Sequence, residues 1–288
     1  LSLHAPTDAA QVVQAEGAHA YGVASCYRRG IVVIPFGPGR DVVVDVFEVT
    51  GGDRHEWLAN GCADYEQNLV TTLRPTEVLD NLGIDGKAVI SIGRNEPVAD
   101  TDKPSPFWGT FREARVTRPT EPWRVTFTAN DPVPPESPGA GPRATEKGPK
   151  PGLHLHWLAP TDATAILARV PRCRYNGELL HKEEASAAFG RNMMHKVIVR
   201  RDGKGLDTTF LAVWEPFARE PWLDSVERLD TVPEADGVGV RLKGGVQSAV
   251  VLYRRPESTS PLSAGGLGSD ARYTVLRTGV GEQSLDLY

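Results

Sequence analysis

The chain has 288 residues and a formal net charge of −5 at pH 7. It carries no basic face or polybasic run, so we expect no nucleic-acid partner, and because no apolar run approaches roughly 18 residues, we expect no membrane span. Glycine and proline are both abundant, with 29 and 23 residues, a composition that favours many short strands joined by turns.

The first strongly patterned segment predicts a β-hairpin. After a mixed lead-in over 1–22, the apolar run 31–34 is followed by a Gly-Pro-Gly turn at 37–39 and by the segment Asp41–Val49, which is rich in β-branched residues. Both faces of this second strand are mostly apolar, which is typical of a strand covered on both sides. Asp45 lies among these apolar neighbours, so we expect its carboxylate to be paired, hydrogen-bonded or bound to a metal.

The hairpin ends in a glycine pair that presents a histidine. Gly51 and Gly52 permit a tight turn with positive φ, and His55 and Trp57 follow on the next extended segment. His55 is the best single candidate for a functional side chain. The alternative is a histidine that packs on Trp57 and organises the turn.

Runs of β-branched and aromatic residues predict the remaining strands. They cover 68–73, 87–92, 108–116, 123–129, 152–158, 165–170, 195–201, 208–214, 237–242 and 248–253, with one or two closing strands over 262–288, of which 272–277 is the better one. Proline cannot donate ladder hydrogen bonds, so the Pro/Gly-rich segment 131–152 is predicted to be a loop or linker. The one modest helical pattern covers 185–194. The strand count predicts an all-β fold, a large antiparallel β-sandwich or stack of sheets with little helix, as a single domain over 1–288.

A second histidine pattern follows the predicted loop. His154 and His156 point to the same face of one strand, roughly 7 Å apart, and such a pair can chelate a metal ion. The sequence identifies no third ligand, and a solvated or substrate-facing strand surface is the alternative. Earlier in the chain, Arg28 could meet a sulfate or carboxylate and Tyr27 could stack on a sugar, although we favour a solvent-exposed strand start for Arg28 and packing inside the sandwich for Tyr27.

Four segments, in this order, resemble the C-terminal β-sheet domain of the heparinase II/III-like polysaccharide lyases. They are Tyr27-Arg28-Arg29, the stretch from Asp45 through Gly51-Gly52-Asp-Arg-His55-Glu-Trp57 to Asn60-Gly61, then Gly152-Leu-His154-Leu-His156, and finally Thr209-Phe-Leu-Ala-Val-Trp-Glu-Pro216. The second segment is the most specific, and the resemblance covers most of the chain. It implies a stacked-sheet domain that forms one wall of a substrate cleft.

The resemblance also implies an activity. Family members join such a domain to a helical toroid and cleave uronic-acid polysaccharides by β-elimination, with the principal base and acid on the toroid. This chain shows no toroid, so we expect it upstream of residue 1, and we expect the isolated chain to be inactive. The implied partners are an acidic polysaccharide and that toroid. The implied setting is periplasmic or secreted, although no signal peptide opens these residues.

Individual residues are carried over from the resemblance. It implies an auxiliary catalytic role for His55 and substrate contacts from Tyr27, Arg28, Trp57, Asn60, His154 and His156. Several family members hold a structural zinc through His and Asp side chains. His4 falls near such a ligand segment, but Ala5 replaces the expected Asn, and a complete zinc site cannot be assembled from the matched residues. The alternative function is a stand-alone, non-catalytic carbohydrate-binding or structural β-sandwich.

Overall fold

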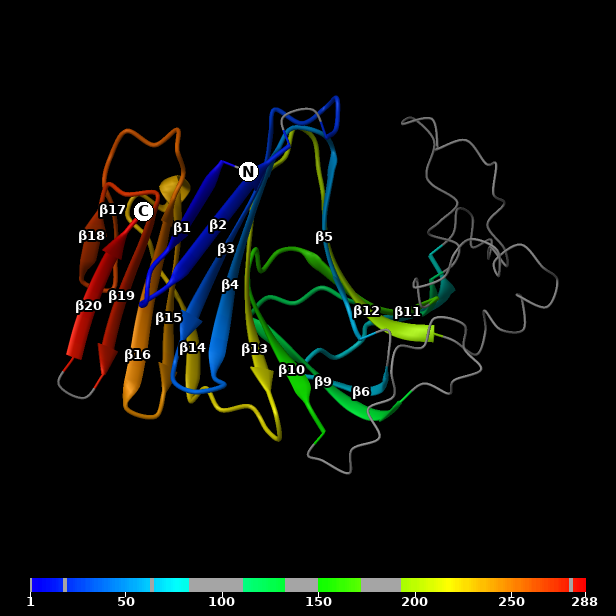
Figure 1. The fold of residues 1–288 in the computed structure, drawn as a ribbon. Coiled ribbons are helices and arrows are strands. Elements are labelled where there is room, and N and C mark those ends of the chain that lie inside the picture. Colours follow the sequence, from blue (N-terminus) through cyan, green and yellow to red (C-terminus); the bar gives the residue numbers. More distant parts are fainter. Residues whose placement is uncertain are drawn as a thin grey trace.

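The computed structural model describes residues 2–17, 20–62, 65–82, 111–132, 150–171, 193–279 and 282–288. Within these residues the strands pair antiparallel, and the only helical element is the short 3-10 helix Glu234–Asp236. The predicted all-β class is therefore confirmed. Figure 1 shows the strands as stacked sheets, with the C-terminal strands (orange and red) at one side of the molecule.

The largest sheet has eight strands and is called the central sheet. In spatial order it contains β1 (Leu3–Pro6), β2 (Gln11–Glu16), β3 (Cys26–Pro35), β4 (Asp41–Thr50), β13 (Asp207–Phe217), β10 (Gly152–Ala159), β9 (Trp123–Pro132) and β6 (Tyr65–Thr71). The predicted hairpin is confirmed, because β3 pairs with β4 from Cys26 opposite Thr50 to Pro35 opposite Asp41.

Two five-stranded sheets flank the central sheet, one on each face. The β12 sheet contains β5 (Arg54–Asn60), β12 (Met193–Asp202), β11 (Thr164–Pro171), β8 (Arg112–Thr117) and β7 (Glu77–Asn81). The β16 sheet contains β14 (Ser225–Leu229), β15 (Gly237–Gly244), β16 (Gln247–Arg254), β19 (Tyr273–Gly279) and β20 (Glu282–Leu287). A small ribbon of β17 (Leu262–Ala264) and β18 (Leu267–Ser269) lies beside the β16 sheet.

Alternation along β4 explains why the sheets stack. Val42, Val44 and Val46 join a core cluster that includes side chains of the β16 sheet. Phe47 and Val49 join a second cluster with side chains of the β12 sheet. Each such side chain contributes about 1.5–3 kcal/mol on leaving water, so a strand with two apolar faces is stable only between two sheets. The predicted burial of both faces is confirmed.

Asp45 is the polar exception on this strand, and its predicted pairing is confirmed. The carboxylate is fully buried. Arg29 donates to both of its oxygens, at 2.9 and 2.6 Å, and the indole nitrogens of Trp57 and Trp214 donate to Oδ2 at 3.1 and 3.4 Å. These donors replace the water that burial removes.

The predictions failed mainly at sheet edges. The lead-in 1–22 contains β1 and β2, the segment 262–288 contains four strands instead of one or two, and β7 and β14 were not predicted. β1, β7, β14 and β20 are all edge strands, where polar side chains face solvent and the apolar pattern weakens. The predicted strand 87–92 and most of the loop 131–152 lie outside the described residues. Of the helical segment 185–194, the structure describes Met193 and Met194, which begin β12.

Candidate functional site

The Gly51–Gly52 turn is a corner at which the chain leaves the central sheet for the β12 sheet. The two glycines have φ values of +94° and +82°. A side-chain Cβ at Gly51 would lie 2.4 Å from the carbonyl oxygen of Val23. Only glycine meets both conditions, because other residues rarely adopt this backbone conformation. The backbone of this corner therefore sets the position of His55 at the start of β5.

His55 is buried and both of its ring nitrogens are hydrogen-bonded. Nε2 lies 2.6 Å from the carbonyl oxygen of Gly51, which can only accept, so Nε2 carries the proton. Nδ1 then accepts from the hydroxyl of Thr208 at 2.9 Å, and that hydroxyl oxygen accepts in turn from Arg201 at 3.1 Å. The ring has no nitrogen left for a substrate proton. This geometry matches the alternative interpretation, in which His55 organises the turn.

A pocket of about 340 Å³ opens beside this corner, and we call it the turn pocket. Three aromatic rings contact one another in a row from the buried core to the surface of this pocket. Phe47 contacts Tyr27 edge to face at 5.0 Å between centroids, and Tyr27 contacts Tyr21 at 5.2 Å. Tyr21 is 58% exposed. Arg54 also lines the pocket, with its Nε donating to Asp202 at 2.6 Å and 56% of its side chain exposed. One exposed and one half-buried tyrosine ring beside an arginine suit a sugar that carries an acidic group. The carboxylates of Asp53 and Glu56 also line the pocket.

Of the residues that the resemblance assigns to substrate, Tyr27 lines the turn pocket, and Arg28 and Trp57 do not. Arg28 is buried rather than solvent-exposed, and its guanidinium donates to Glu16, Glu48 and Glu257 at 2.8 to 2.9 Å. Trp57 is 1% exposed and packs against two other tryptophans. Both side chains hold the sheets together.

Two further candidates lie on the surface, away from the turn pocket lining. Asn60 is exposed at the end of β5, and His4 is exposed on the edge strand β1. Four strands of the central sheet separate β1 from the strand of His154 and His156. The structure therefore brings His4 together with neither of the other histidine positions.

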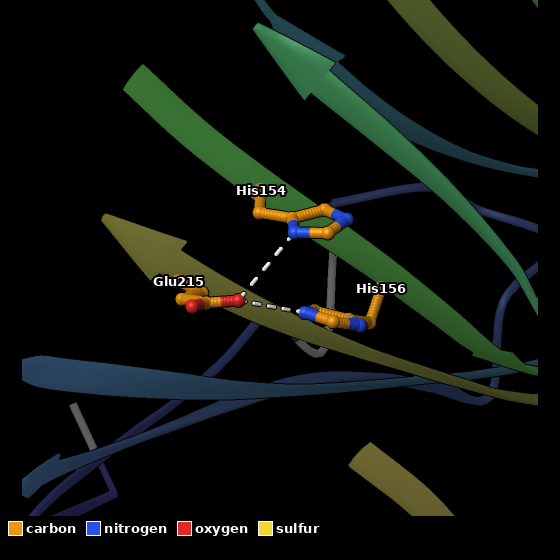
Figure 2. A group of neighbouring side chains, drawn as sticks. All are labelled: His154, His156 and Glu215. Atoms are coloured by element: carbon orange, nitrogen blue, oxygen red, sulfur yellow. Dashed lines mark hydrogen bonds and ion pairs between the residues drawn. The ribbon is translucent and has the colours of Figure 1, made fainter. Parts of the chain in front are cut away.

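The second histidine pattern forms a compact cluster with Glu215, which we call the histidine cluster (Figure 2). Antiparallel pairing places His154 directly opposite Glu215 on β13, with His156 diagonal to it. His156 Nε2 lies 3.0 Å and His154 Nδ1 lies 3.5 Å from the same oxygen, Oε2 of Glu215. The imidazole rings stack with centroids 4.3 Å apart. The predicted common face is confirmed, and it is largely buried instead of solvated.

The other oxygen of Glu215 fixes the direction of the carboxylate. Oε1 accepts from the backbone N–H groups of Trp222 and Leu223, the latter at 2.7 Å. Burial raises the pKa of Glu215, but the hydrogen bonds from His156 and these backbone groups outweigh it and hold that pKa below its ordinary value. The carboxylate is thus ionised at neutral pH, with Oε2 aimed at the two histidines.

His154 differs from its neighbour in what its ring nitrogen contacts. Nδ1 is buried and has no hydrogen-bond partner. Burial and the neighbouring His156 lower the pKa of His154 to about 4, although the charge of Glu215 acts in the opposite direction. At neutral pH the ring is therefore uncharged. A pocket of about 260 Å³ adjoins both histidines and is lined on other sides by Arg124, Leu223 and Asp224.

Sequence reasoning missed Glu215 and Tyr21. Glu215 stands in the quoted segment 209–216, but its approach to His154 depends on the pairing of two strands about sixty residues apart. Tyr21 lies in the lead-in, where no pattern marked it. Five residues separate Tyr21 from Tyr27, and this spacing does not predict that the two rings contact each other in the folded chain.

Comparison with known proteins adds no family assignment, because no protein-family model and no curated protein matches the chain. Among the described residues, no helix is both long and apolar enough to cross a membrane.

Proposed function

We propose that this chain is the substrate-binding β-sheet domain of a polysaccharide lyase that acts on uronic-acid-containing polysaccharides. The observation that carries the proposal is the turn pocket, which lies beside the most specific segment of the resemblance. Tyr21 and Tyr27 provide flat apolar faces for a sugar ring, and Arg54 provides a guanidinium for its carboxylate. The mildly acidic whole chain requires such a local cation to bind an acidic polymer.

In this proposal proton transfer belongs to another part of the enzyme. β-Elimination requires a base for the proton next to the uronate carboxylate and an acid for the leaving oxygen. His55 provides neither while both of its nitrogens are hydrogen-bonded inside the protein. The helical toroid that the resemblance implies would supply both groups, and this chain would form the opposite wall of the cleft.

One observation favours a second candidate, a non-catalytic carbohydrate-binding β-sandwich. Both nitrogens of His55 are engaged, and the two carboxylates that also line the turn pocket are hydrogen-bonded inside the protein, Asp53 to the N–H of Gly205 at 3.2 Å and Glu56 to Arg200 at 2.6 Å. The two candidates make the same prediction for binding by this chain and differ in whether a toroid completes the enzyme. Joining the chain to its upstream coding sequence and assaying for unsaturated uronate product distinguishes them.

The binding experiment is electrophoresis through gels that contain alginate, heparin or neutral dextran. We expect retardation by a uronate polymer and none by dextran. Tyr21→Ala and Arg54→Ala should each weaken the retardation about five-fold, because one stacked ring or one exposed ion pair contributes about 1 kcal/mol. Val246→Ala and Arg219→Ala are matched controls, since both residues are exposed on other parts of the surface. Migration that none of the polymers slows would overturn the proposal.

A further inference from the structure

The histidine cluster has the donor set of a transition-metal site. It offers two imidazole nitrogens and one carboxylate oxygen, each from a different residue, and the three atoms all lie within 4.8 Å of one another. Mixed nitrogen and oxygen ligands suit Zn²⁺, whereas Ca²⁺ and Mg²⁺ prefer oxygen alone. Two histidines and one glutamate are also a ligand set that zinc enzymes use.

The distances fit one ion bound by all three residues. Zinc lies about 2.0–2.2 Å from nitrogen and oxygen ligands in tetrahedral geometry, so two ligand atoms of one ion are about 3.4 Å apart. Oε2 of Glu215 lies 3.0 Å from His156 Nε2 and 3.5 Å from His154 Nδ1. Figure 2 shows both rings directed at this one oxygen. The three atoms lie within 4.8 Å of one another, so binding an ion requires the two imidazole nitrogens to lie about 3.4 Å apart.

The surroundings prepare these groups for a cation. The backbone N–H groups of Trp222 and Leu223 hold the far oxygen of Glu215, which is the outer-shell support that orients metal ligands. His154 Nδ1 is buried without a hydrogen-bond partner, and a buried nitrogen of this kind is costly unless something binds it. A metal ion would satisfy it.

We propose that His154, His156 and Glu215 bind a divalent transition ion of the Zn²⁺ type, with its fourth position open to the adjoining pocket. Three protein ligands and an open position are the arrangement of zinc sites that also bind water or a ligand. The pocket of about 260 Å³ provides that access, and Arg124 in its wall can attract an anionic group towards the ion. Asp224 lines the pocket too, but its carboxylate accepts from the backbone N–H of Gly245 at 2.8 Å.

This site is independent of the proposed polysaccharide binding. The histidines face the β16 sheet, whereas the turn pocket lies on the face of the β12 sheet. It also differs from the zinc that the resemblance implies, because four strands of the same sheet separate His4 from these histidines. A failure of polysaccharide binding would therefore leave the metal site untouched, and the reverse also holds.

The test measures zinc alone, added to chelator-treated protein and followed by isothermal titration calorimetry, with Co²⁺ absorption as a second probe of geometry. We expect one equivalent of zinc and the intense visible bands of four-coordinate Co²⁺. His154→Ala and His156→Ala should each weaken zinc binding at least ten-fold, the loss that is typical of changes at a metal site. His4→Ala is the matched control and should bind zinc as the unchanged chain does.

Glu215→Gln keeps the test decisive if an alanine variant fails to fold. Its amide oxygen can still accept from Trp222 and Leu223, so the β13 end keeps its hydrogen bonds while the anionic ligand is lost. Zinc affinity should fall at least ten-fold with an unchanged circular dichroism spectrum. The proposal is overturned if the unchanged chain binds no zinc, or if Glu215→Gln and the histidine variants bind it as tightly as the unchanged chain.

Discussion

His55 and His154 are the two histidines that the sequence marks most clearly, and the structure places them in opposite situations. His55 is buried with both ring nitrogens hydrogen-bonded, to Thr208 and to the carbonyl of Gly51. His154 is buried with Nδ1 unpaired and directed at a carboxylate oxygen 3.5 Å away. The more specific sequence motif thus contains the histidine with less chemical freedom.

A specific sequence motif can therefore reflect a structural requirement as readily as a reactive group. The glycine pair and His55 are needed together because the chain must turn from one sheet to the next. The histidine cluster needs no unusual backbone and arises from strand register alone. Four measurements test this contrast, in order of decreasing expected effect.

The strand that leads into the corner should be the most sensitive to change. Asp45→Ala removes a fully buried carboxylate from Arg29 and from two indole N–H groups, which should lower the free energy of unfolding by about 3–5 kcal/mol. Asp202→Ala breaks the exposed ion pair with Arg54 and should cost about 1 kcal/mol or less. Urea unfolding measures both. Similar costs for the two aspartates would show that burial of Asp45 matters little.

The two histidines should differ in their contribution to stability in the metal-free protein. His55→Ala removes the acceptor of the Thr208 hydroxyl proton and the donor to the carbonyl of Gly51, and should cost about 2–3 kcal/mol. His154→Ala loses packing but no hydrogen bond of Nδ1, and should cost about 1 kcal/mol. Urea unfolding in the presence of a chelator compares them directly. A larger cost at His154 would reverse the interpretation of both sites.

The corner itself can be tested with two glycines of positive φ. Gly51→Ala strains the backbone and brings a Cβ against the carbonyl of Val23, so it should cost about 2 kcal/mol or more. Gly37 has a φ of +122° in the β3–β4 turn, and no atom lies within 4 Å of a Cβ added there. Gly37→Ala should therefore cost about 1 kcal/mol, from the backbone conformation alone. Thermal unfolding of the two variants isolates the close approach at Gly51. Equal shifts would mean that φ alone determines the cost.

The smallest effect should be a pH dependence at the base of the corner. Burial raises the pKa of Asp207, but hydrogen bonds from Arg255 and Thr50 outweigh it and hold that pKa below its ordinary value. The native state therefore favours the ionised form. The resulting stability is fully present above the unfolded-state pKa of about 4 and is lost as pH falls through the lower native pKa.

The side chain of Asp207 is half exposed, so its contribution should be under about 1 kcal/mol. Asp207→Asn should remove that part of the acid sensitivity, whereas Asp230→Asn, at an exposed position, should leave it unchanged. Unfolding free energies between pH 6 and pH 3 provide the comparison. If the stability of Asp207→Asn depends on pH as that of the unchanged chain does, the lowered pKa of Asp207 is contradicted.

The all-β class, the β3–β4 hairpin and the burial of both faces of β4 could be predicted from the sequence. These follow from local patterns of β-branched residues and turn glycines, which act within about ten residues. The sequence did not determine the edge strands β1, β7, β14 and β20, because an edge strand buries too little apolar surface to show a clear pattern.

Which histidine has an unpaired ring nitrogen depends on contacts between strands that are distant in the chain. The hydroxyl of Thr208 hydrogen-bonds Nδ1 of His55, and the carboxylate of Glu215 lies beside Nδ1 of His154. Thr208 and Glu215 both belong to β13, far along the chain from the histidines that they contact. The register of β13 with β10 places Glu215 opposite His154. The register of β13 with β4 places Thr208 opposite Val49, and the corner after β4 then brings His55 of β5 to Thr208. Register is a non-local property, since it requires sheets to form before the side chains can meet.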